Sequence, residues 1–115
     1  MGIYILRTPE GKVVRVDTNK DERLYETPRN PPNTGDTYTR GTDLYRHVAR
    51  SGKVYYYFIR WSMWQGEEPS IELASEQRAK EFLIEKAGVA GAAKLSDEEM
   101  RRAEELFPGI FDETA

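Results

Sequence analysis

Residues 53–61, with the sequence KVYYYFIRW, constrain the fold of this chain more than any other segment. β-branched and aromatic side chains at this density favour a β-strand. Successive side chains of a strand point to opposite faces, so Tyr55, Tyr57 and Trp61 share one face, and the intervening residues, also largely apolar, share the other. A strand that is apolar on both faces is typically central in a sheet and covered on both sides. The alternative is that one face contacts another chain.

Two turns that end in glycine predict two β-hairpins. Gly11 and Gly52 supply the left-handed backbone that tight turns require, and Pro9 presets the first central position of the earlier turn. The segments that flank these turns are rich in β-branched and aromatic residues. The expected strand pairs are 3–7 with 12–17 and 43–48 with 53–61.

A further strand and a first helix are expected after the hairpins. Residues 70–74 alternate between polar and apolar side chains, which predicts a short fifth strand. Ser75 is a favourable N-cap for a helix over about 76–87, whose apolar residues recur at helical spacing. Gly88 fits a left-handed stop after this helix.

A second helix is expected to follow a linker of small residues, 89–95. Ser96 and Glu99 have the spacing of a capping box, in which each side chain bonds the backbone of the other residue. The helix is expected to run to about Leu106, because proline and glycine follow shortly after. The tail 112–115 is expected to fray.

Prolines and glycines interrupt residues 18–41, which predicts a long loop between the two hairpins. The elements on either side favour antiparallel pairing, since adjacent hairpins need no crossover connection. We therefore expect a single α+β domain over residues 1–115. Its core is an antiparallel sheet of about five strands, namely two hairpins and the short fifth strand, with two C-terminal helices.

Composition excludes several classes of protein. The chain has 115 residues and no cysteine, which excludes disulfide scaffolds, thiolate metal sites and thiol catalysis. No apolar run reaches the roughly 18 residues of a membrane-spanning helix. The N-terminus lacks the basic start and apolar core of a signal peptide. The expectation from these features is a cytoplasmic protein that does not associate with membranes.

No catalytic constellation is recognisable. His47 is the only histidine, so any triad of serine, histidine and aspartate depends on it. Glu67 and Glu68 are adjacent, and neighbouring carboxylates rarely span a glycosidic bond at the separation that its cleavage requires. The chain is therefore predicted not to be an enzyme.

One short segment has part of a calcium-ligand pattern. Asp17, Asn19 and Asp21 occupy the first, third and fifth positions of an EF-hand loop. The sixth and twelfth positions, which need glycine and glutamate, are Glu22 and Pro28. A solvated turn is the better interpretation, and we expect no metal and no cofactor.

Aromatic side chains beyond the needs of a small core indicate a contact surface. Trp64 follows Trp61 by three positions, an odd spacing that does not place both on one face of a strand, so one of them is expected to be exposed. Tryptophan is also enriched at interface hot spots. The leading hypothesis is a non-enzymatic interaction or regulatory module that binds a protein partner or a second copy of itself. Its expected contact surface centres on Trp61, Trp64, Tyr55, Tyr57 and the loop 26–40.

The alternative hypothesis is a single-stranded nucleic-acid-binding protein. Residues 1–61 carry 11 basic and 7 acidic side chains, whereas residues 62–115 carry 6 and 13. Proteins that bind single strands combine a positive groove with aromatic rings on which bases stack. The cations expected to serve this function beside the strand tyrosines are Arg46, Arg50, Lys53 and Arg60.

Overall fold

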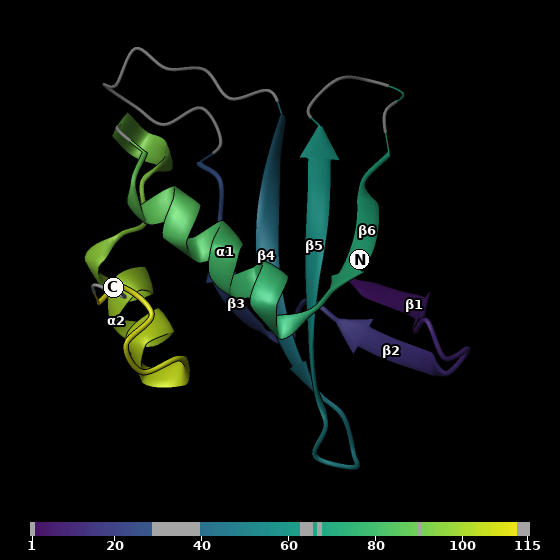
Figure 1. Cartoon of the computed structure of the whole chain (residues 1–115). Coiled ribbons are helices and arrows are strands. Elements are labelled where there is room, and N and C mark those ends of the chain that lie inside the picture. The colour runs from purple at the N-terminus through teal and green to yellow at the C-terminus, as the bar shows by residue number, and fades with distance from the viewer. Residues whose placement is uncertain (1, 29–39, 63–65, 67, 90, 113–115) are drawn as a thin grey trace.

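The computed structural model describes residues 2–28, 40–62, 66, 68–89 and 91–112 (Figure 1). In chain order its elements are β1 (Ile3–Arg7), β2 (Val13–Asp17), β3 (Glu22–Tyr25), β4 (Arg40–Val48), β5 (Val54–Ser62), β6 (Ser70–Ala74), α1 (Glu76–Ala87), the 3₁₀ turn η1 (Gly91–Ala93) and α2 (Asp97–Leu106). The strands form two antiparallel sheets, one of β1 and β2 and one in the order β3-β4-β5-β6. The predicted α+β class is confirmed, with six strands in two sheets among the described residues instead of about five in one.

Both predicted hairpins are present, and their turns have the expected chemistry. Gly11 and Gly52 have φ angles of +86° and +90°. The Gly11 N–H donates to the Thr8 carbonyl at 2.9 Å, and the Gly52 N–H donates to the Ala49 carbonyl at the same distance. Strand β5 pairs with β4 along its whole length, from Val48 opposite Val54 to Arg40 opposite Ser62.

Strand β5 lies at the centre of the four-stranded sheet, between β4 and β6, as its sequence predicts. Tyr56 and Phe58 face a core formed with Leu83 of α1 and Phe107 at the end of α2. Figure 1 shows α1 lying across this face of the sheet. Burial of these side chains, each worth roughly 1.5–3 kcal/mol, holds the helices against the sheet.

The β1–β2 hairpin covers the opposite face of the four-stranded sheet. Val14 and Val16 of β2 pack with Tyr57 and Ile59 of β5 in a second core. The hairpin thus covers the sheet as a separate layer. A single sheet of about five strands was therefore the wrong expectation, because the apolar inner face of the hairpin is buried only if it lies on the other sheet.

Both helices begin at the predicted caps. Ser75 Oγ accepts from the Arg78 N–H at 3.1 Å. Ser96 Oγ accepts from the Glu99 N–H at 3.1 Å, while the Ser96 N–H donates to the Glu99 carboxylate at 2.8 Å. The left-handed stop expected at Gly88 is wrong. Its φ is −94°, because its N–H bonds the carbonyl three residues earlier and closes the last turn in a right-handed conformation.

The expectation of a loop throughout residues 18–41 is also wrong, since β3 lies within it. Leu24 and Tyr25 are 3 % and 1 % exposed, and their burial holds β3 against β4. A bulge between Arg23 and Tyr25 removes the alternation that would have indicated a strand. Residues 29–39 and 113–115 lie outside the described part of the chain, as does most of the expected loop 26–40 and of the expected frayed tail.

Candidate functional site

The turn between β2 and β3 places the carboxylate of Asp21 against the four-stranded sheet, on the face that the hairpin covers. The N–H groups of Lys20 and Asp21 donate to the Asp17 carbonyl at 3.0 and 2.7 Å. The Asp17 N–H in return donates to Asp21 Oδ2 at 3.0 Å. These bonds fix the turn, and the Asp21 side chain is only 8 % exposed.

Two side chains of the four-stranded sheet also bind Asp21. His47 Nδ1 of β4 lies 2.8 Å from Asp21 Oδ1, and the Tyr57 hydroxyl of β5 donates to Asp21 Oδ2 at 2.7 Å. Burial, and then the hydrogen bond to the negative Asp21, raise the pKa of Tyr57, which keeps its hydroxyl protonated as a donor. A buried carboxylate is stable only when its oxygens are satisfied, and these contacts together with the Asp17 N–H supply three partners.

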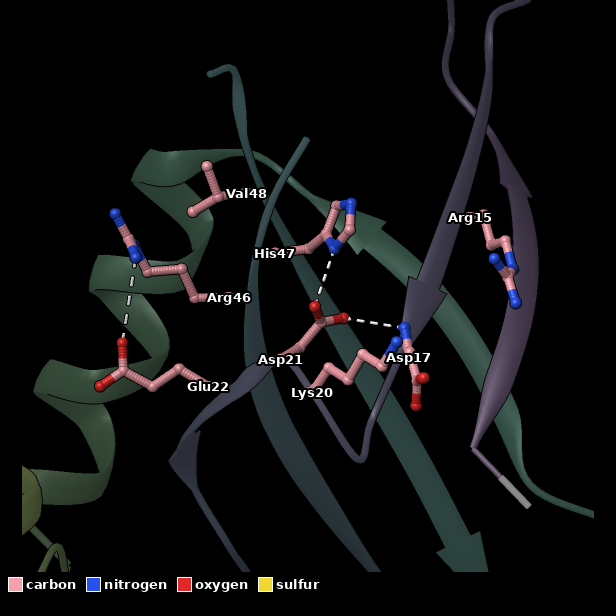
Figure 2. A pocket seen from close by; sticks show the side chains of 8 residues that line it. All are labelled: Arg15, Asp17, Lys20, Asp21, Glu22, Arg46, His47 and Val48. Carbon is pink, nitrogen blue, oxygen red and sulfur yellow. Dashed lines mark hydrogen bonds and ion pairs between the residues drawn. The ribbon is translucent and has the colours of Figure 1, made fainter. Parts of the chain in front are cut away.

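The bond to Asp21 also determines which nitrogen of His47 is free. A carboxylate only accepts hydrogen bonds, so Nδ1 carries the proton and Nε2 holds the lone pair when the ring is neutral. Figure 2 shows Nε2 on the side of the ring away from Asp21. The Tyr55 ring lies 6.5 Å from the His47 ring, centroid to centroid. His47 is therefore held in one orientation with its second nitrogen available.

A pocket of about 440 Å³ opens beside this histidine (Figure 2). It lies where β2, the β2–β3 turn and the end of β4 meet. The side chains that line it belong to Arg15, Asp17, Lys20, Asp21, Glu22, Arg46, His47 and Val48.

The pocket's glutamate is neutralised within the fold. Glu22 accepts two hydrogen bonds from the Arg102 guanidinium of α2, one of them at 2.9 Å, and lies 3.9 Å from Arg46. The hydrogen bond from Arg102 holds the pKa of Glu22 below its ordinary value. Figure 2 shows Arg46 directed toward Glu22 and away from His47. Arg46 Nε is buried without a partner among the described residues.

Two cations of the pocket have no such neutralising partner. Arg15 and Lys20 are exposed, and neither forms an ion pair with another residue in the described part of the chain. The remaining acid, Asp17, accepts the Asn19 N–H at 2.9 Å. The two cations left open toward the pocket, Arg15 and Lys20, are both hydrogen-bond donors.

A second surface lies next to the pocket, on the side of the hairpin that faces away from the molecule. Ile3, Ile5 and Val13 are 42, 64 and 60 % exposed there, and they are three of the five exposed large hydrophobic side chains among the described residues. Cross-strand register places all six outward residues together. We call this surface the outer face of the hairpin, formed by Ile3, Ile5, Arg7, Val13, Arg15 and Asp17.

The structure places two of the four predicted partner-binding residues in the interior. Trp61 is 7 % exposed and donates its indole N–H to Asp43 at 3.0 Å, and Tyr57 is fully buried. Tyr55 is half-buried against the hairpin. Trp64 lies outside the described residues. Trp61 and Tyr57 thus belong to the core, and the hairpin covers Tyr57. Partner binding by the predicted set stays a prediction.

The four cations of the nucleic-acid hypothesis do not share one surface. Arg46 and Arg60 lie on the helix side of the sheet, where Arg60 pairs with Glu72 at 3.1 Å. Arg50 is in the β4–β5 turn, and the Lys53 ammonium lies 5.3 Å from the Tyr55 ring centre. Tyrosines expected as stacking platforms, Tyr45 and Tyr57, stack on each other in the interior, with ring centres 5.2 Å apart. Single-strand binding stays a prediction.

Sequence reasoning missed the contact between Asp21 and His47. The two residues lie 26 positions apart and meet only because β3 pairs with β4. The spacing of Asp17 and Asp21 was the only local signal, and it was interpreted as a solvated turn with part of a calcium-ligand pattern. In the described part of the chain no group of three histidine or acidic side chains is arranged to hold a metal ion.

Comparison with known proteins gives no relative. No protein-family model matches the chain, and no curated protein or solved structure is significantly similar to it. Among the described residues, no helix has the length and apolar character needed to cross a membrane.

Proposed function

We propose that this chain is a protein-interaction module that associates with a second copy of itself through the outer face of the hairpin. The observation that supports it is the cluster of Ile3, Ile5 and Val13, exposed together on one side of a two-stranded sheet.

The hairpin carries apolar side chains on both sides, although the described residues cover only one of them. Its inner residues, which include Val14 and Val16, are buried against the four-stranded sheet. An antiparallel hairpin with one solvated face normally alternates apolar and polar residues. Contiguous exposed apolar side chains at that face mark an interaction surface more often than a neutral one.

A second copy fits this surface because its charges are self-complementary. The outer face carries Arg7 and Arg15 together with Asp17, so the same surface on two subunits can pair cation with carboxylate around an apolar centre. A face only two strands wide lies at the small end of specific interfaces. The expected dimer is therefore weak, and it forms in a concentration-dependent way.

Two exposed isoleucines provide a matched test. Ile5→Lys places a charge on the outer face, whereas Ile84→Lys does the same on α1, where Ile84 is 49 % exposed. Sedimentation velocity from about 10 µM to about 1 mM covers the range of a weak contact. Wild type and Ile84→Lys should dimerise, and Ile5→Lys should stay monomeric at an unchanged melting temperature. A wild-type protein that is monomeric throughout, or a dimer that Ile5→Lys leaves intact, contradicts the proposal.

A further inference from the structure

We infer that the pocket beside His47 binds the phosphate group of a ligand, with His47 Nε2, Lys20 and Arg15 as its hydrogen-bond donors. The inference does not depend on self-association, because only Arg15 and Asp17 belong to both surfaces, and Lys20 and His47 belong to the pocket alone.

The charges of the pocket are arranged for an anion. Asp21 has three hydrogen-bond partners, and Glu22 is bound by Arg102 and faces Arg46. Those acids therefore repel an incoming anion less than free carboxylates would. The cations are left without partners, since neither Arg15 nor Lys20 forms an ion pair with a described residue.

His47 adds a third donor only when its ring is protonated, because the neutral ring holds a lone pair at Nε2. His47 Nδ1 lies 2.8 Å from Asp21 Oδ1, so a protonated ring presents its second N–H, at Nε2, to the pocket. Histidine is the side chain that ordinarily changes charge between about pH 5 and 8. An anion at Nε2 therefore favours proton uptake by the ring.

Each element packed around His47 contributes charged or titratable groups that affect proton uptake by its ring. The titratable and charged groups around it are Arg15 and Asp17 on β2, Lys20 and Asp21 in the turn, Glu22 on β3, Tyr45 and Arg46 on β4, and Tyr55 and Tyr57 on β5. Asp17 is the one acid of the pocket that has neither an ion pair nor a side-chain donor among the described residues. The Asp17 carboxylate is expected to oppose anion binding, so its replacement should strengthen binding, whereas replacement of a cation should weaken it.

Phosphate suits these donors better than a carboxylate does. The donors come from separate elements, β2, the turn and β4, and a tetrahedral anion can accept from several directions at once. A volume of about 440 Å³ is within the usual range for small-ligand pockets. The phosphate can belong to a small ester or to a nucleic-acid strand, and the experiment separates these sources.

The test is direct because His47 is the only histidine, so the proton on its Cε1 gives a single NMR resonance to follow. The probes are inorganic phosphate, adenosine 5′-monophosphate and a single-stranded RNA of about ten nucleotides, within the usual length of such sites. Chloride at matched ionic strength is the control. Phosphate or the monophosphate should shift the resonance saturably and move its pH midpoint upward. A shift with RNA alone that Lys20→Gln abolishes supports the pocket and assigns its phosphate to a strand.

The variants are at positions that are not buried, which keeps the test independent of folding. Lys20→Gln should weaken binding about tenfold, the order of one charge-assisted hydrogen bond, whereas Asp17→Asn should strengthen it about threefold. The matched control, Arg50→Gln, removes an exposed cation from the β4–β5 turn outside the pocket and should bind like wild type. Shifts no larger than those with chloride, or equal weakening by Lys20→Gln and Arg50→Gln, overturn the inference.

Discussion

At the scale of single residues, Asp21 joins more of the fold than any local pattern indicates. Its carboxylate connects the β2–β3 turn to His47 on β4 and to Tyr57 on β5. Buried polar networks of this kind stabilise when every member is satisfied, and they are costly when one member is lost.

Asp21→Asn should lower the free energy of unfolding by roughly 1–3 kcal/mol, because the amide cannot accept every bond that the carboxylate accepts and leaves a buried donor unsatisfied. Urea denaturation measures the change. Asp17→Asn is the matched control, since the Asp17 side chain accepts only an exposed backbone N–H and its loss should cost little. Equal effects of the two substitutions would show that Asp21 does not hold the strands together.

At the scale of elements, local chemistry predicts most of what the structure shows. The turn glycines, the two serine caps and the aromatic run of β5 each act within a few residues, so sequence alone indicates both hairpins, both helices and the central strand. The sequence does not indicate strand β3, because its bulge interrupts the alternation of polar and apolar side chains. The sequence also does not indicate that one sheet stacks on the other, because this arrangement depends on contacts between apolar faces that are far apart along the chain.

Gly41 shows how closely two of these elements approach. A Cβ at this position would lie 2.4 Å from the Trp61 ring and 2.6 Å from the Thr27 side chain. Gly41→Ala should therefore cost roughly 1–3 kcal/mol by overpacking, and it should displace Trp61 and red-shift the tryptophan fluorescence.

Gly88→Ala is the matched control for Gly41→Ala. Its new Cβ would meet only ordinary contacts, the nearest at 3.6 Å, in a right-handed backbone that alanine adopts readily. Chemical denaturation and emission spectra should show wild-type behaviour for Gly88→Ala. An equally mild Gly41→Ala would mean that Trp61 does not pack against β4 as described.

At the scale of the whole molecule, the four-stranded sheet has a cover on each face. The helices bury one face and the hairpin buries the other, which explains why β5 is apolar on both sides without a partner chain. The largest group of exposed apolar side chains therefore lies on the hairpin, on the side that faces away from the four-stranded sheet. The sequence indicates an excess of aromatic side chains, whereas the exposed apolar residues of the hairpin are aliphatic, since long-range packing decides which apolar faces are covered.

Self-association through the outer face of the hairpin is tested most directly by amide chemical shifts measured at increasing protein concentration. Resonances of Ile3, Ile5 and Val13 should move together as the dimer forms, while those of α1 stay in place. Shifts that gather on α1 or on α2, or no shifts up to about 1 mM, would contradict it.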